Sequence, residues 1–211
     1  MPADDDRIGV DFIDPLFAVA LSLNFEELKK EPWFTDWPLI LRTPHNFTFL
    51  TLALVWATVI LSWVGYHRSI KTSPIRVRTL AGWWRFILDV LLLVFYFVLL
   101  VSYQDFKREL RVLAIVFFLF IVWDRFKKIE HPRAEYADDA QWTKATAQRG
   151  VTVVWFIFFL CLAIFYWLHP PQTRYECEDW LLLAAAVVGT VLYRVHKVRL
   201  WWPRVVQILG F

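Results

Sequence analysis

The chain has 211 residues, of which 58% are hydrophobic, and it carries a formal net charge of +3. Its mean hydropathy is +0.44, and long apolar runs alternate with charged stretches, which excludes an ordinary soluble domain. We therefore predict an integral membrane protein that is not an enzyme. Cys161 and Cys177 form no metal-binding or redox spacing, so no metal site or cofactor is predicted.

Six apolar runs predict an all-α, polytopic membrane protein. A helix needs about 20 mostly apolar residues to cross about 30 Å of hydrocarbon. The first run is the most polar and the fourth is short, so four full spans with two partial ones is the alternative. In chain order the predicted spans are residues 8–28, 47–66, 84–103, 110–126, 151–168 and 180–196.

The first span carries an unusual number of polar residues for a membrane helix. Val19, Leu23 and Glu26 lie at i, i+4 and i+7 on one helical face, and Ser22 borders that face. Such a face could line a pore, with apolar constrictions, a nearby hydroxyl and a carboxylate at the outer mouth. The alternative is a helix buried among the others, in which Asp14 acts only as the N-cap.

The second span ends with a run of aromatic and basic residues that contains Trp63, His67 and Arg68. The predicted topology places these residues near the same membrane face as Asp14, so either His67 or Arg68 could pair with that carboxylate. The alternative is that both basic residues meet lipid headgroups.

Two later spans carry features that predict helix contacts. Asp89 follows Arg85 by one helical turn in the third span, so it either balances Arg85 as an i, i+4 ion pair or packs toward the interior of the bundle. The sixth span contains the small residues 184–186 and Gly189, which predict close packing against another helix.

The predicted topology treats residues 1–211 as one transmembrane domain, with a cytoplasmic loop at residues 127–149 and an interfacial tail at residues 198–211. With six spans, both termini share one side with the second–third and fourth–fifth loops. Most Lys and Arg residues fall on this side, so the positive-inside rule predicts that both termini are cytoplasmic.

Residues 12–23 resemble the first helix of the transmembrane-protein-175 family of potassium channels, which has a Phe-Ser-Asp motif followed by an apolar stretch. Trp63 and His67 are similar to a Trp and a His near the end of that family's second helix. Ile13 stands where the family has Ser, and Pro15 where it has a small residue. The matching residues of the first helix are Phe12, Asp14, Phe17, Ala18, Ala20 and Leu23.

The resemblance implies a homotetramer of single six-helix repeats of the prokaryotic type, with the first helices around a cation pore. Val19 and Leu23 would form its apolar constriction, and Ser22 a hydroxyl layer. The first two helices would be joined by a network for which the candidate residues are Phe12, Asp14, Trp63, His67 and Arg68.

The predicted function is an oligomeric channel for potassium or another monovalent cation, with Val19, Ser22, Leu23 and Glu26 lining the pore. Its expected partner is the lipid bilayer of a prokaryotic inner membrane, not nucleic acid. One alternative is a non-conducting membrane subunit or effector that binds a partner through its cytoplasmic loop and tail. Another is a redox subunit that binds haem or a quinone.

Overall fold

The computed structural model describes residues 8–31, 34, 45–76, 78–135, 139–169 and 177–199. Over these residues the chain has no β-strand and six α-helices, which confirms the predicted all-α class. A 3₁₀ turn, η2, covers Arg133–Glu135. The α-helices are α1 (Ile8–Leu28), α4 (His45–Thr72), α5 (Leu80–Val101), α6 (Phe106–Glu130), α7 (Asp139–Leu168) and α8 (Cys177–Arg199).

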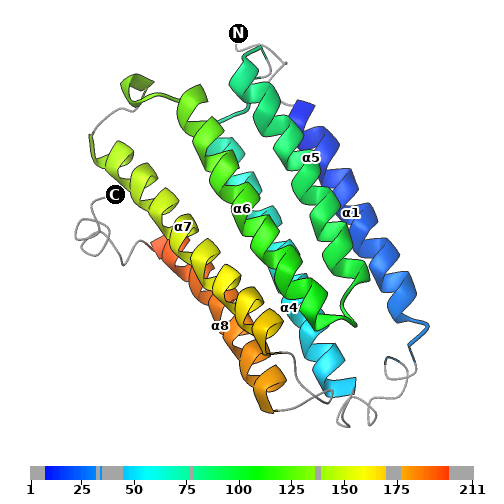
Figure 1. Cartoon of the computed structure of the whole chain (residues 1–211). Helices are drawn as coiled ribbons and strands as arrows, with labels where there is room; N and C mark the ends of the chain where they lie inside the picture. The colour runs from blue at the N-terminus through cyan, green and yellow to red at the C-terminus, as the bar shows by residue number, and fades with distance from the viewer. Residues whose placement is uncertain are drawn as a thin grey trace.

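The helices run alternately up and down in one elongated bundle (Figure 1). Helix α6 lies between α5 and α7, while α1 lies at one edge of the bundle and packs against α5 and α4. Helix α8 packs against α7 and α4. This alternation brings the beginning of α1 and the end of α8 toward the same end of the bundle, which we call the terminal end.

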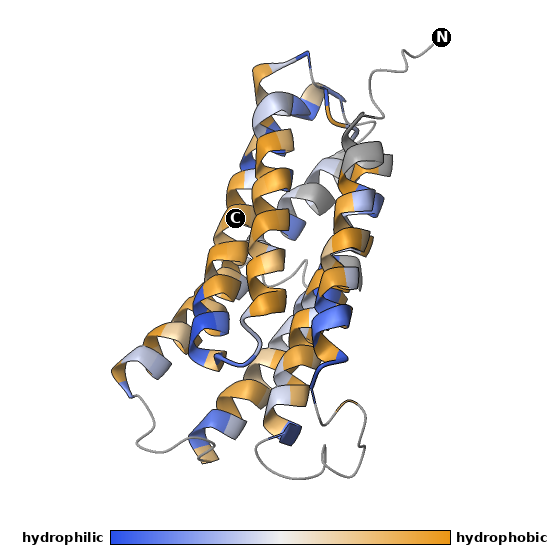
Figure 2. Cartoon of the chain, turned by 90° about the vertical axis from the view of Figure 1, so that its right-hand side faces the viewer, coloured by the Kyte–Doolittle hydropathy of each residue, from blue (hydrophilic) through white to orange (hydrophobic). Residues whose placement is uncertain are grey.

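Four helical segments are long and apolar enough to cross a membrane: His45–Ile70, Leu80–Val101, Gln148–Leu168 and Cys177–Lys197. Large apolar side chains such as Val94, Ile157 and Leu181 are more than half exposed on their outer faces, and Figure 2 shows apolar residues along most of the helical surface. Such a surface is typical of contact with lipid and indicates an integral membrane protein. Helices α1 and α6, the two weakest predicted spans, are not among the four.

Aromatic rings fill the interface of α6, α7 and α8. Phe117 stacks on Phe159 with ring centroids 4.5 Å apart and meets Tyr193 at 4.8 Å. Gly189 lets α8 approach α7, because a Cβ at this position would lie 2.5 Å from the ring of Phe158. This contact confirms the close packing predicted from the small residues of the sixth span.

The fourth–fifth connection is shorter than the sequence suggested. Helix α6 continues to Glu130 and α7 begins at Asp139, so most of the predicted loop 127–149 is helical. Both helices extend beyond their apolar runs because their polar continuations contain good helix formers, and α6 ends just before Pro132. Beyond Arg199, the predicted interfacial tail lies outside the described residues.

Replacing Gly189 by Val should destabilise the packing of α7 against α8. The added side chain would overlap Phe158 and Trp155, and overpacking of this kind costs about 1–3 kcal/mol. Thermal unfolding in detergent should show a lower midpoint for Gly189→Val. Its neighbour Val188 is 55% exposed, so Val188→Leu is the control and should leave the unfolding midpoint unchanged. Equal unfolding midpoints for the two variants would contradict the packing argument.

Candidate functional site

Helix α1 has one face that packs into the bundle. Its buried residues recur every three or four positions: Ile13, Phe17, Ala20, Asn24 and Leu28. Asn24 makes polar contacts with two other helices, since its Nδ2 donates to the carbonyl oxygen of Leu100 (2.5 Å) and its Oδ1 accepts from the indole of Trp56 (2.8 Å). These bonds hold the second half of α1 against α5 and α4.

The opposite face of α1 is uncovered. Val19 and Leu23 are 52% and 51% exposed, and Ser22 and Glu26 are exposed beside them. The carboxylate of Glu26 pairs with Lys29 at 2.7 Å. All four predicted pore-lining residues therefore share the outer face of a helix at the bundle edge (Figure 1).

Asp14 joins the first half of α1 to α4. Its Oδ1 accepts a hydrogen bond from Trp63 Nε1 (3.1 Å), and its Oδ2 lies 2.9 Å from Nε2 of His67. The other ring nitrogen of His67 lies 3.1 Å from the carbonyl oxygen of Trp63. Both nitrogens of this imidazole are thus engaged within the protein, which counts against its use as a haem ligand.

The structure corrects the alternative in which Asp14 caps the start of the first helix. Helix α1 is already formed at Ile8, and Pro15 lies inside it. The carboxylate of Asp14 is therefore used by another helix rather than by the first turn of its own. Arg68, the other candidate partner, is exposed, and the side chain of Phe12 lies outside the described part of the structure.

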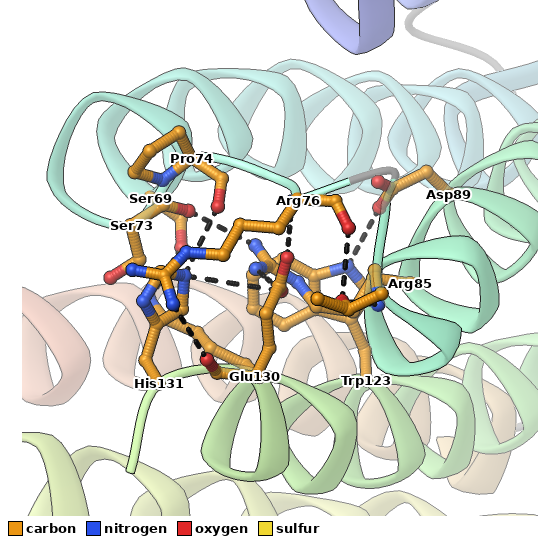
Figure 3. A network of polar contacts seen from close by, with 12 residues as sticks. Ser69, Ser73, Pro74, Arg76, Arg85, Asp89, Trp123, Glu130 and His131 are labelled. Carbon is orange, nitrogen blue, oxygen red and sulfur yellow. Dashed lines mark hydrogen bonds and ion pairs between the residues drawn. The ribbon is translucent and has the colours of Figure 1, made fainter. Parts of the chain in front are cut away.

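A second polar cluster lies at the terminal end of the bundle, where α5, α6 and the α4–α5 connection meet (Figure 3). The guanidinium of Arg85 is fully buried and forms an ion pair with Glu130, whose side chain is also fully buried. Arg85 also donates to the carbonyl oxygen of Ser73 (3.2 Å), and its guanidinium lies 4.6 Å from the ring of Trp123. A buried charge needs such partners, because an unpaired one is very costly in a low dielectric.

Of the two alternatives for Asp89, the ion pair with Arg85 is absent from the described residues, whereas packing toward the bundle interior is confirmed by its exposed fraction of 5%. Asp89 instead accepts a hydrogen bond from the indole of Trp123 (2.8 Å), while Arg85 pairs with Glu130 of α6. The tertiary contact prevails because α6 presents a carboxylate directly to the buried guanidinium. Sequence reasoning missed Glu130, whose only signal was an acidic residue among bases at the end of the fourth run.

The connection between α4 and α5 is held on the end of α6. The backbone nitrogen of Arg76 donates a hydrogen bond to the carboxylate of Glu130. The guanidinium of Arg76 donates two hydrogen bonds to the carboxylate of Glu135, of 2.8 and 2.7 Å. His131 lies between the carbonyl oxygen of Pro74 (3.0 Å) and Glu135 (3.2 Å). The hydrogen bonds from Arg76 lower the pKa of the Glu135 carboxyl, and the hydrogen bond from His131 adds to this effect.

Comparisons of the chain with protein-family models, with curated proteins and with solved structures found no match. Over the described residues, no group of three His, Cys, Asp or Glu side chains is arranged to hold a metal ion. The fold and these contacts define an all-helical integral membrane protein with two polar networks at helix interfaces and one uncovered helix face.

Breaking the buried pair should be far more damaging than replacing it. Arg85→Met or Glu130→Met alone would leave one uncompensated buried charge, which typically costs about 3–5 kcal/mol. The double variant removes both charges and should recover much of that loss. Unfolding midpoints in detergent test this prediction, and a double variant less stable than either single variant would contradict it.

Acid should loosen the α4–α5 connection. A carboxyl with a lowered folded-state pKa contributes stability above its unfolded value, about 4.3 for Glu, and this contribution is lost as the pH falls through the folded value. Hydrogen exchange in residues 73–79, corrected for the intrinsic pH dependence, should therefore quicken as the pH falls below about 4.3. Glu135→Gln is the control and should remove most of this change, whereas an unaltered pH profile would show that another group is responsible.

Proposed function

We propose that this chain forms a homo-oligomeric, cation-conducting channel in which the outer face of α1 lines the pore. The observation that carries the proposal is the two-sided character of α1, whose inner face is packed while Val19, Ser22 and Leu23 are uncovered at the bundle edge. Lipid hydrocarbon offers no hydrogen-bond partner to a hydroxyl, whereas a water-filled axis shared by several copies would.

Copies of α1 around a common axis would arrange the pore in layers. Val19 and Leu23, one turn apart, would form apolar constrictions that control hydration, and Ser22 would supply a hydroxyl ring between them. Glu26 would lie near the mouth of the pore that is opposite to the terminal end. Its ion pair with Lys29 offsets part of its negative charge. The resemblance of residues 12–23 to a tetrameric channel family makes a homotetramer the proposed assembly.

Two anchors would keep α1 in place while its outer face meets the neighbouring copies. Asp14 binds α4 through Trp63 and His67, and Asn24 binds α4 and α5 about 15 Å further along the helix. The pore face would therefore be positioned by contacts on the opposite side of the same helix.

In the proposed topology all six helices cross the membrane, and both chain ends lie in the cytoplasm. Helix α6 is too polar to qualify by hydropathy, but its Glu109, Asp124 and Glu130 are buried against neighbouring helices rather than exposed to lipid. Lys127 and Lys128 in its last turn lie at the terminal end, as the positive-inside rule requires of a cytoplasmic side. A prokaryotic inner membrane is the proposed location.

Potassium flux in liposomes tests the proposal. The full chain, reconstituted with an outward potassium gradient, should pass ions above the level of empty liposomes, and Val19→Asn and Leu23→Asn should raise this flux several-fold by wetting the constrictions. Val94→Asn is the matched control, because Val94 is 51% exposed on α5 against 52% for Val19. We expect this control to conduct like the wild type.

The outcomes separate the candidate functions. Absence of flux in the wild type and in both α1 variants would reject the channel. The remaining candidate function would then be the non-conducting membrane subunit, for which no contact of the described residues supplies independent support. Equal effects of Val19→Asn and Val94→Asn would reject α1 as the pore lining even if the protein conducts.

A further inference from the structure

A partly open cavity of about 60 Å³ lies between the helices of the bundle, away from the outer face of α1. Its walls come from five helices, α1, α4, α5, α6 and α8, and most of them are apolar. Two ionisable side chains of opposite charge also line it, Asp89 from α5 and Arg194 from α8, together with the hydroxyl-bearing residues Ser62, Tyr66 and Ser69 from α4. We call it the interior cavity.

Asp89 is the first reason to expect an occupant. The residue is 5% exposed, and only one of its carboxyl oxygens is satisfied, by the indole of Trp123. Its Oδ2 is buried and has no hydrogen-bond partner among the described residues. Leaving a buried carboxyl oxygen unpaired is costly, and native proteins commonly satisfy such atoms with ordered water.

Arg194 presents the opposite charge to the same cavity. Its guanidinium donates to Ser62 Oγ (2.8 Å) and lies so close to Gly65 that a Cβ there would come within 2.3 Å of Nη1. No ion pair joins Arg194 to Asp89 in the described part of the chain. The carboxyl and the guanidinium therefore face one cavity without an ion pair between them.

The carboxyl and the guanidinium together decide what kind of occupant fits. A cation bound near Asp89 would meet the guanidinium of Arg194, and an anion bound near Arg194 would meet the carboxyl of Asp89. Water carries no net charge, donates to the carboxyl and accepts from the guanidinium. The volume of about 60 Å³ is several times the ~10–15 Å³ that a cavity needs to hold one water molecule, so it has room for a small cluster.

We propose that the interior cavity is a binding site for a small cluster of water molecules that bridges Asp89 to the hydroxyls of α4 and to Arg194. The bridge connects α5 to α4 and α8 across a region that side chains leave open. It also places water next to Ile13 and Phe17 on the packed inner face of α1. The proposal holds whether or not the protein conducts ions.

Radiolytic footprinting of the full chain in nanodiscs tests the water cluster. Hydroxyl radicals formed from bound water oxidise the side chains beside it, and water labelled with ¹⁸O identifies their source. Tyr96 is 3% exposed and lines the cavity, whereas Tyr193 is 2% exposed and lies outside it. We expect Tyr96 to be oxidised several-fold faster than Tyr193, and equal slow oxidation of both would overturn the proposal.

Variants at residue 89 link the water to the carboxyl. Asp89→Asn keeps a hydrogen-bonding group and should retain fast oxidation of Tyr96, while Asp89→Leu should reduce it to the rate of Tyr193. If Asp89→Leu does not fold, the oxidation rates of Tyr96 and Tyr193 in the wild type still test whether the cavity holds water. A further outcome is that Tyr96 is oxidised only in the presence of potassium and not when a bulky organic cation replaces the potassium. This result would show that an ion organises the site, and it would overturn the proposal of a site for water alone.

Discussion

The guanidinium of Arg85 is the charge around which the terminal end of the bundle is organised. It is wholly removed from solvent, so its desolvation must be compensated by Glu130, the carbonyl of Ser73 and the face of Trp123. Glu130 and Trp123 belong to α6, and Ser73 belongs to the α4–α5 connection. The relative positions of α5 and α6 thus follow from one ion pair, because separating them would leave a buried charge unpaired. The α4–α5 connection is held at the same place by the hydrogen bond to the carbonyl oxygen of Ser73.

The same constraint explains how a helix as polar as α6 can lie in the centre of the bundle. Its carboxyl groups are buried against protein, and two of them have partners there: Glu130 meets Arg85, and Asp124 accepts from Thr152 (3.0 Å) with Lys197 at 3.7 Å. The third, Glu109, has no hydrogen-bond partner among the described residues. Polar groups on central helices are tolerable when neighbouring helices supply their partners. The charged and polar residues that α1 and α6 carry are why hydropathy identifies α4, α5, α7 and α8 but passes over these two helices.

Helix α1 shows how much of the candidate site could be predicted. Its bounds, the shared face of Val19 and Leu23, and the proximity of Asp14 to His67 follow from helical periodicity and topology, and the structure has the same arrangement. Asn24 was not assigned to the inner face, although Ile13, Phe17 and Ala20 precede it at helical spacing. A short polar residue can face either a pore or a protein partner, and only the positions of Trp56 and Leu100 decide between them.

The amino-acid sequence by itself determined the all-helical class, the approximate helices and their membrane character, because hydrophobic length and periodicity are local properties of the chain. Only the tertiary structure decided which charges pair. Arg85 has Asp89 one turn away, yet it binds Glu130, which is 45 positions away in the chain. Ion pairing depends on which side chains converge in a low-dielectric interior, and that convergence is set by the packing of the whole bundle.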